Sequence, residues 1–331
     1  MTQGKILVTG GAGYIGSATA RALKRAGHEP LILDDLRSGH EKACAGMALI
    51  RGDAGDSSVL KDIFKKNKIQ AVFHFAASIE VGESVEKPSK YWRNNFVTTL
   101  SLLEAMDEAG IKKLVFSSTA AVYGDAKEIP IREESPRYPV NPYGWAKWAC
   151  EGAIEGFSTA HGLKAVRLRY FNAAGADPGG DHGDAHLNQT RLVTMCLKAA
   201  MKKIPKFTIF GSDYPTPDGT CVRDYIHVED LAGAHLAALS HLEAGREGGA
   251  FSLGNGEGYS VRQVVGVSKK VSGVDYPVVE GPRRPGDPPS LVADSSKARK
   301  VLGWTPKYPK LEDIIGHAWA WHQKHPEGYG H

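Results

Sequence analysis

Tyr143 and Lys147 are the residues whose types and spacing could together make a base. Residues four apart on a helix lie on the same face, so a helix here would set the phenol beside the ammonium group. A nearby positive charge favours the phenolate, and lowering a tyrosine pKa from about 10 to about 7 takes roughly 4 kcal/mol. One lysine supplies only part of that, and many such pairs lie on solvated faces. The interpretation of this pair as a base therefore depends on the other residues that the fold places beside it.

Glycines follow the first apolar run of the chain. The run Ile6–Val8 is typical of a strand buried on both faces, and Ser17–Ala26 is rich in helix formers. In a strand–turn–helix unit, glycines let the backbone approach a pyrophosphate, and the start of the helix offers free N–H groups. We therefore predict a dinucleotide site at the turn that contains Gly10, Gly13, Tyr14, Ile15 and Gly16.

An acidic residue ends the next strand. The run Pro30–Leu33 leads into Asp34, eighteen residues after Gly16, where a carboxylate binds the adenosine ribose of a dinucleotide. Asp34 would repel a 2′-phosphate, so the pattern favours NAD, although Arg37 nearby leaves NADP open. The strand, turn, helix and acidic residue together make this prediction much stronger than the glycines alone.

Two further strands end in residues suited to a cofactor. Ala48–Asp53 ends in a carboxylate that either reaches the adenine or caps the following helix. Ala71–Ala77 ends in small residues that allow a cofactor to pass close by, and His74 within it is interpreted as structural. In the predicted helix from Pro88 to Ala109, Asn94 and Asn95 are mildly unfavourable, so we expect one of them to make a buried hydrogen bond near the cofactor.

The strand Lys113–Thr119 ends in three hydroxyl residues, Ser117, Ser118 and Thr119. The carboxyl edge of a parallel sheet is where ligands bind in open α/β folds. Residues 139–142 contain two prolines that break the chain before the helix of Tyr143, so that helix should start at the same edge. The run from Lys164 to Tyr170 is the last clear strand of this lobe.

The length of 331 residues exceeds what one core usually supports, so we expect two lobes. We predict a Rossmann-type doubly wound parallel α/β sheet in residues 1–172 and a smaller α/β substrate lobe in residues 173–331, with some elements free to return to the first. The net charge of +4 is spread along the chain and does not suggest a nucleic-acid surface. Four separated cysteines, no apparent signal peptide and no long apolar run favour a cytoplasmic protein.

The second half carries arginines beside glycine- or proline-rich breaks, namely Arg223, Arg283 and Arg284. Their planar forks match phosphate geometry, and Asp287 could accept ribose hydroxyls; ordinary surface charge is the alternative for each. The loop from Gly175 to Asn188 contains His182, His186, Asp181 and Asp184, which could suggest a metal site. No regular element fixes their spacing, so we predict no metal site.

Together these residues resemble the UDP-glucose 4-epimerases of the extended short-chain dehydrogenase/reductase family. The resemblance runs nearly end to end, and the second-half motifs are its most specific part. It is carried by the segments Val8–Ser17, His74–Ala77, Val81–Val85, Val122–Asp125, Asn141–Gly144, Leu168–Asn172, Ile209–Gly211, Tyr214–Thr216, Asp218–Thr220, Val222–Val228 and Arg283–Asp287.

The resemblance implies that Tyr143 takes the proton from the sugar 4-hydroxyl, that Lys147 binds the nicotinamide ribose and lowers the tyrosine pKa, and that Thr119 binds the 4-oxygen. Hydride would leave C4 for NAD and return to the other face of the 4-keto sugar. Cofactor contacts are implied for Gly10, Gly13, Tyr14, Ile15, Gly16, Asp34, Asp53, Ala54, Phe75, Ala76, Ala77, Asn94, Ser117, Tyr143, Lys147 and Tyr170. Substrate contacts are implied for Thr119, Tyr143, Asn172, Arg191, Phe210, Arg223, Arg284 and Asp287. A homodimer is common in this family.

Two positions depart from the family pattern. Ile79 stands where many members carry a lysine near the nicotinamide, and Leu291 stands at the position that governs acceptance of N-acetylated sugars. A pentose 4-epimerase for UDP-xylose and UDP-arabinose shares the same motifs and stays open. A dehydratase or decarboxylase would need an acid beside Thr119, where Ala120 and Ala121 stand. A non-catalytic dinucleotide-binding regulator is disfavoured because the predicted base is retained.

Overall fold

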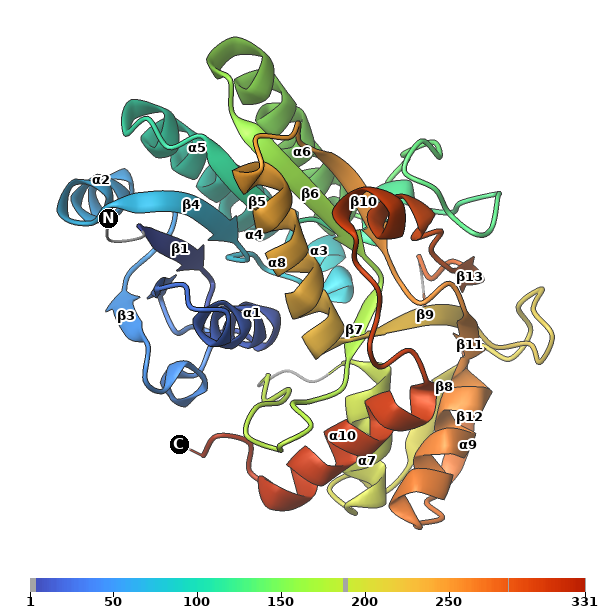
Figure 1. Ribbon diagram of the computed structural model, residues 1–331. Helices are drawn as coiled ribbons and strands as arrows, with labels where there is room; N and C mark the ends of the chain where they lie inside the picture. Colours follow the sequence, from blue (N-terminus) through green and yellow to red (C-terminus); the bar gives the residue numbers. More distant parts are fainter. Residues whose placement is uncertain (1–3, 187–189, 285, 331) are drawn as a thin grey trace.

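The apolar runs of the first half form the parallel strands of one large sheet in the computed structural model, which describes residues 4–186, 190–284 and 286–330 (Figure 1). Leu7 of the first strand pairs with Leu31 on one side and Val72 on the other. All neighbouring strands run parallel. Their order is β10 (Gly249–Leu253), β6 (Lys164–Tyr170), β5 (Lys113–Ser117), β4 (Ile69–His74), β1 (Lys5–Thr9), β2 (Pro30–Asp34) and β3 (Ala48–Arg51).

Helices cover both faces of this sheet, because its strands are apolar on both sides. One face packs against α1 (Tyr14–Arg25) and α8 (Val228–Glu243). The other packs against α2 (Ser57–Lys66), α5 (Thr98–Glu108) and α6 (Pro142–His161). The predicted Rossmann-type architecture is thereby confirmed.

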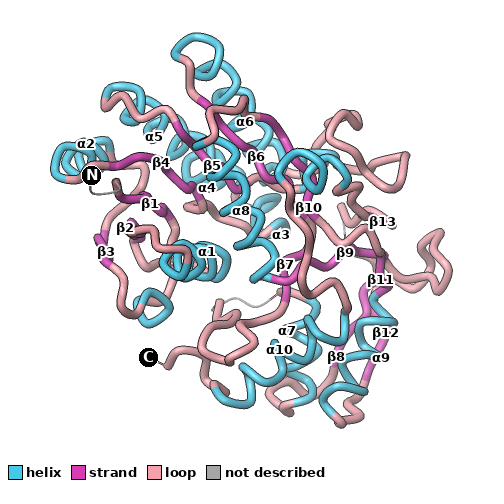
Figure 2. Tube along the Cα trace, in the orientation of Figure 1, coloured by secondary structure: helices cyan, strands magenta, loops and turns pink. Residues whose placement is uncertain are grey.

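The second lobe has its own core. Helices α7 (Leu192–Ala200), α9 (Val261–Ser272) and α10 (Leu311–Lys324) pack together there, below the large sheet in Figures 1 and 2. Short strands accompany them: β9 (Val222–His227) pairs with β7 (Asn172–Ala174), β11 (Gly258–Ser260) and β13 (Ser290–Leu291), and β8 (Phe207–Phe210) pairs with β12 (Val278–Gly281).

β10 lies beside β6, so a strand of the second half belongs to the large sheet, a return that the domain prediction left open. One feature differs from the sequence predictions. The helix predicted from Pro88 to Ala109 is divided into α4 (Pro88–Tyr91), a π-helical segment η2 (Trp92–Val97) and α5. Such π-helical turns shift the side chains that follow and are frequent at functional sites.

Four further short elements complete the described chain. They are the single-turn helices η1 (Glu41–Cys44) and η3 (Ala120–Tyr123), the helix α3 (Val81–Glu86), and the π-helical segment η4 (Ala298–Leu302). None of the helices in the described ranges combines the length and apolar character needed to cross a bilayer.

Candidate active site

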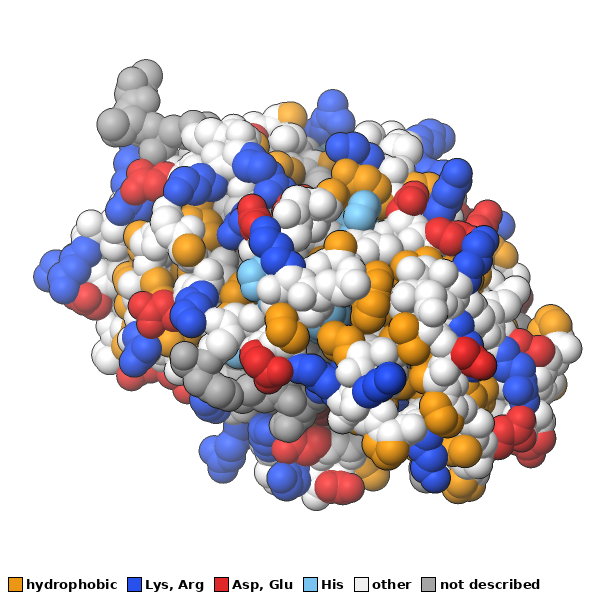
Figure 3. Space-filling model, turned by 90° about the horizontal axis from the view of Figure 1, so that it is seen from below, with side chains coloured by type: hydrophobic (Ala, Val, Ile, Leu, Met, Phe, Trp, Pro, Cys, Tyr) orange, Lys and Arg blue, Asp and Glu red, His pale blue; other side chains and the backbone are white. Residues whose placement is uncertain are grey.

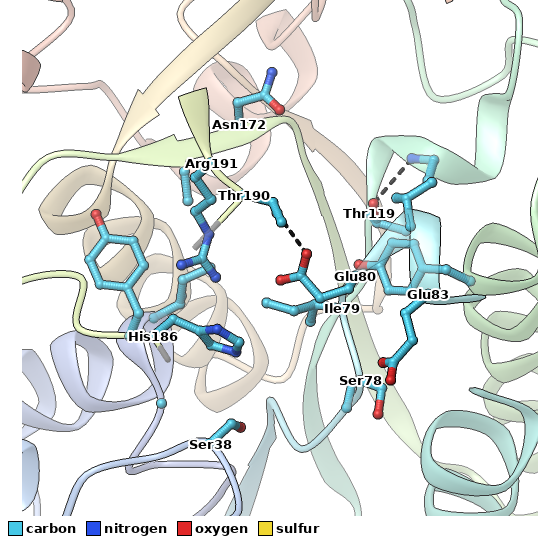
Figure 4. A pocket seen from close by; sticks show the side chains of 18 of the residues that line it. Ser38, Ser78, Ile79, Glu80, Glu83, Thr119, Asn172, His186, Thr190 and Arg191 are labelled. Carbon is cyan, nitrogen blue, oxygen red and sulfur yellow. Dashed lines mark hydrogen bonds between the residues drawn. The ribbon is translucent and has the colours of Figure 1, made fainter. Parts of the chain in front are cut away.

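A cavity of about 1540 Å³ lies at the carboxyl ends of β1, β4, β5 and β6. The glycine turn lines it, as do residues of the second lobe such as Arg223 and Arg284. Figure 4 shows side chains from both lobes pointing into this space. Every cofactor, catalytic and substrate residue predicted from the sequence lies on its wall.

The start of α6 positions Tyr143. The Asn141 side chain accepts a hydrogen bond from the Gly144 N–H at 2.9 Å, so it caps the helix, and Pro142 occupies the first turn. Gly144 itself allows close packing, since a Cβ there would lie 2.6 Å from the Ala121 carbonyl oxygen. The rings of Tyr143 and Tyr91 pack nearly perpendicular to each other, with 6.4 Å between their centroids. The phenol is thus fixed in a buried position.

Lys147 lies one turn further along α6 and is also buried. Its Nζ donates a hydrogen bond to the Ser117 carbonyl oxygen at 2.8 Å and lies 4.8 Å from the centre of the Phe116 ring. Burial lowers the pKa of Lys147 to about 8 and raises the pKa of Tyr143 to about 12. The effect of Lys147 on the pKa of Tyr143, expected from the family resemblance, stays a prediction.

The polar end of β5 faces the same cavity. The Ser117 hydroxyl hydrogen-bonds to the Tyr170 hydroxyl, and Thr119 contacts Tyr143 in a way that favours its phenolate. Ser118 points elsewhere, because its hydroxyl donates to Glu151 at 2.5 Å. The strand end thus supplies Ser117 and Thr119 to the cavity, as the sequence predicts, and Ser118 to the core behind it.

The start of α1 presents unused backbone donors to the cavity. Gly13 occupies the cap position without a side-chain cap, and the first turn of α1 holds no acidic residue. The Asp34 carboxylate accepts hydrogen bonds from the Ala12 and Leu36 N–H groups at 2.9 and 2.8 Å. Free N–H groups and a fixed carboxylate are the donor and acceptor set that a dinucleotide requires.

Asn95, rather than Asn94, makes the buried hydrogen bonds expected in this region. Its Oδ1 accepts from the Ser78 N–H at 2.8 Å, and its Nδ2 donates to the Ser78 carbonyl oxygen at 3.0 Å. Asn94 lines the cavity and donates to the Ser78 hydroxyl at 3.1 Å. Together they fix the segment that follows β4, including Ala76 and Ala77 on the cavity wall.

Two other sequence interpretations can be compared with the structure. Asp53 does not cap α2, since Asp56 accepts from Ser58 N–H in that role, and Asp53 lies at the cavity beside Ala54. His74 is buried between hydroxyls, with ring nitrogens 2.6 Å from Thr9 Oγ1 and 3.0 Å from Thr99 Oγ1. Burial lowers the His74 pKa to about 3, so the neutral ring ties β4 to β1 and to α5.

The second lobe contributes charged and aromatic groups. Arg284 lies over the Phe210 ring at 4.0 Å, and Arg223 lies 3.5 Å from Asp287. Arg283 pairs with Asp213 and does not line the cavity. Only Pro285 of the predicted motif lies outside the described residues.

Histidines and aspartates of the loop after Gly175 have other partners. His182 stacks on Tyr14, with 5.9 Å between ring centroids, and contacts the Ser17 hydroxyl at 2.7 Å. Asp184 accepts from Arg191 at 2.7 Å through each oxygen. The end of this loop, residues 187–189, lies outside the described part of the chain. Its described residues thus bind the two lobes together.

Sequence reasoning missed Glu80 and Thr190. The Glu80 Oε2 accepts a hydrogen bond from the Thr190 hydroxyl at 2.6 Å, which joins the segment after β4 to the segment before α7 (Figure 4). The only sequence signal was a carboxylate between the apolar residues Ile79 and Val81, beside a cofactor-binding strand end. Nothing in the sequence indicated its partner.

A model of the NAD dependent epimerase/dehydratase family matches residues 6–254. The chain is 49% identical over 324 residues to the UDP-glucose 4-epimerase of Halalkalibacterium halodurans, covering 98% of this chain and 97% of that protein. The chain belongs to the UDP-glucose 4-epimerase branch of this family.

Solved structures of this branch have the same fold. The Brucella ovis UDP-glucose 4-epimerase in complex with NAD is 42% identical, with a TM-score of 0.93 over 96% of this chain and 98% of that one. The Bifidobacterium longum UDP-glucose 4-epimerase in complex with NAD+ and UDP is 37% identical, with a TM-score of 0.94 over 98% and 100%. The similarity to these epimerase structures therefore extends over both lobes of the chain.

Proposed function

We propose that this protein interconverts UDP-glucose and UDP-galactose by epimerisation at C4 of the sugar, with NAD as a cofactor that stays bound. The observation that carries the proposal is the content of one cavity. Its wall holds the phosphate-binding turn, the set Tyr143, Lys147 and Thr119, and the arginines of the second lobe. Membership of the epimerase family supports the same conclusion.

The residues around the cavity fit bound NAD. The uncapped start of α1 would hold the pyrophosphate, and Asp34 would accept the adenosine ribose hydroxyls. Lys147 would hold the nicotinamide ribose, near the small side chains of Ala76 and Ala77. When bound there, NAD would supply the acceptor for the C4 hydride and the donor that returns it to the sugar.

The remaining residues on the cavity wall would contact the substrate. Tyr143 takes the proton from the 4-hydroxyl, while Thr119 hydrogen-bonds the 4-oxygen. Arg223 and Arg284 bind the pyrophosphate as planar forks. The remaining contacts are Asp287 with the uridine ribose, Phe210 with the uracil, and Asn172 and Arg191 with the sugar or phosphate groups.

The surroundings of Thr119 argue against a dehydratase. Ala120 and Ala121 follow it, so no acid stands at that position. Glu151 is close in the fold, yet it is buried and bound by Arg169 and Ser118. Although burial favours the neutral carboxyl, Arg169 holds the pKa of Glu151 below its ordinary value, so it is not a proton donor at neutral pH.

The test is to purify the protein without adding cofactor, measure bound NAD after denaturation, and assay conversion of UDP-galactose to UDP-glucose. We expect bound NAD, turnover without added cofactor, and a loss of roughly 10²–10⁴-fold in turnover for Tyr143→Phe, which is the usual contribution of general base catalysis. Parallel assays with UDP-arabinose and UDP-N-acetylgalactosamine report on the pocket around Leu291 and Ile79. Absence of turnover on every UDP-sugar would reject the proposal.

We also propose a cytoplasmic homodimer. All four cysteines are buried and free, which fits a reducing compartment. Exposed apolar side chains occur along α3 and η2, namely Val81, Val85, Trp92 and Val97. Apolar side chains exposed within one short segment, residues 81–97, favour a contact between subunits.

A further inference from the structure

Asp224 is a fully buried carboxylate of the second lobe to which the proposed chemistry gives no part. It lies on β9, next to Arg223. Its Oδ1 accepts a hydrogen bond from the Asn255 N–H at 2.8 Å, and its Oδ2 accepts from the Gly256 and Ala293 N–H groups at 3.0 and 3.1 Å. Burial of a carboxylate is costly unless it is hydrogen-bonded. Here the donors are backbone groups, so the carboxylate fixes the chain segments that carry them.

These segments belong to the two strands that flank Arg223, and β9, β11 and β13 lie side by side (Figure 1). On one side Leu291 of β13 pairs with Arg223, and Ala293 follows β13 two residues later. On the other side Tyr259 of β11 pairs with Arg223, and the turn at Asn255 and Gly256 leads into β11. One carboxylate therefore anchors both neighbours of Arg223.

Both flanking strands are short, with two residues in β13 and three in β11. Strands of this length form few ladder hydrogen bonds, so their positions depend on anchors at their ends. The packing around the anchor is tight, because a Cβ at Gly254 would lie 2.3 Å from Asp224 Oδ2 and 2.7 Å from Ala293 Cβ. The carboxylate thus has little freedom to move, and neither do the strands that it holds.

The residues positioned in this way face the cavity. Arg223 and Leu291 line it, whereas Asp224 itself is not part of its wall. The Arg223 fork is directed by its own strand, since its Nη1 donates to the Val222 carbonyl oxygen at 2.9 Å and its Nη2 lies 3.5 Å from Asp287. A guanidinium binds a phosphate with two parallel hydrogen bonds only when its plane is correctly oriented. Displacement of β9 or β13 would therefore weaken binding without touching the first lobe.

We propose that Asp224 is a positioning residue for substrate binding, which holds Arg223 and Leu291 at the cavity wall through the backbone of β11 and β13. This inference deepens the proposed function and rests on it. Tyr143 and Lys147 are positioned by α6 of the first lobe, so the reaction of bound substrate does not depend on this anchor. Loss of the anchor should therefore raise KM rather than lower kcat.

The experiment measures Asp224→Ala, which leaves three buried N–H groups without an acceptor. We expect the KM for UDP-galactose and the calorimetric Kd for UDP to rise by about 10-fold, the size of effect expected when a charge-assisted hydrogen bond is misaligned. The kcat at saturating substrate should change by less than about 2-fold, because binding common to ground and transition states is what is lost. The NAD content of the purified protein should stay at the wild-type level.

Asp230→Ala is the matched control. Asp230 is also buried, and its carboxylate accepts from the Lys307 and Tyr308 N–H groups at 2.7 and 2.9 Å, away from the cavity wall. This variant should lose stability in denaturant titration as Asp224→Ala does, yet keep the wild-type KM and the wild-type affinity for UDP. The comparison separates positioning of the cavity wall from general destabilisation.

A second variant covers the case in which Asp224→Ala fails to fold. Asp224→Asn keeps the shape of the side chain, but its NH₂ group must face at least one of the three backbone donors, so a smaller rise in KM and Kd, about 3-fold, is expected. Wild-type affinity in a folded Asp224 variant would overturn the inference, as would an equal rise in Asp230→Ala or a fall in kcat with KM unchanged.

The UDP measurement also distinguishes the inference from the proposed reaction. If the wild type binds UDP but converts no UDP-sugar, the proposed reaction fails, while the UDP affinities of the Asp224 and Asp230 variants still decide the inference. A wild type that does not bind UDP would reject both.

Discussion

Asn94 and Asn95 are neighbours in the chain but lie in different surroundings. The Asn95 side chain is 1% exposed and satisfies the backbone of Ser78, whereas Asn94 reaches the Ser78 hydroxyl from the cavity wall. Loss of a buried hydrogen-bond partner leaves polar groups unsatisfied, and this penalty is larger than the net gain from an exposed bond. Asn95 therefore stabilises the fold, whereas Asn94 faces the cavity.

Asn95→Ala should reduce the free energy of unfolding by about 1–3 kcal/mol, because it leaves the Ser78 N–H and carbonyl groups without their hydrogen-bond partner. Asn94→Ala should change it by less and should instead weaken retention of bound NAD. Denaturant titration and the NAD content of the purified proteins measure the two effects. The assignment is wrong if Asn94→Ala is the less stable variant.

Glu151 and Arg169 form an ion pair behind the active site, with Nη2 to Oε2 at 2.5 Å and both side chains almost fully buried. Removal of one partner leaves a buried charge, so Glu151→Gln should destabilise the protein by about 3–5 kcal/mol. The Glu151 pKa is lowered in the folded protein, so its stabilising contribution is present above pH about 4.5 and is lost as the pH falls below that value. As the pH is lowered from neutral to well below about 4.5, the unfolding free energy should therefore decline less steeply in Glu151→Gln than in the wild type.

At the level of elements, α6 contains glycines with different surroundings. A Cβ at Gly144 would lie 2.6 Å from the Ala121 carbonyl oxygen, whereas a Cβ at Gly152 would meet nothing within 4 Å. Gly144→Ala should displace the start of α6 and lower turnover by about 10- to 100-fold, since small displacements of reacting groups are costly. Gly152→Ala should keep turnover and stabilise the protein by roughly 0.5–1 kcal/mol. Wild-type turnover in Gly144→Ala would show that this contact does not position Tyr143.

Most elements of the first lobe could be predicted because local signals define them. The apolar run of β1, the glycine turn and the prolines before α6 each identify an element within a few residues. β10 could not be assigned to the large sheet, because it is short and its partner β6 is distant in sequence. The π-helical turn of η2 separates the roles of Asn94 and Asn95 in a way that the sequence does not show, since periodicity does not reveal an added residue in a helical turn.

The same limit applies to the candidate site. Strand ends and helix starts are local signals, and they suffice to predict that Asp34, Thr119 and Tyr143 share one edge of the sheet. Glu80 could not be predicted as a site residue, because it lies in an irregular segment and its hydrogen-bond partner belongs to the other lobe. Contacts between segments far apart in the chain leave no periodic pattern.

At the scale of the whole molecule, basic and acidic side chains are interspersed on the face shown in Figure 3 rather than gathered into one patch. The proposed homodimer depends instead on apolar contacts. Val97→Glu should shift the protein from dimer to monomer in sedimentation experiments, because it places a charge among exposed apolar side chains. Ile129→Glu, which changes a similarly exposed residue in another segment, serves as the control. Monomeric wild-type protein would reject the dimer.

The return of β10 to the large sheet has a consequence for how the chain is made. The outer edge of β6 has no sheet partner until Gly249–Leu253 has been synthesised. An unpaired strand edge is prone to join other chains, and domains generally fold as units during synthesis. The nascent chain therefore carries an unfinished first lobe through the synthesis of much of the second, and a ribosome stall in that interval would leave an aggregation-prone edge exposed.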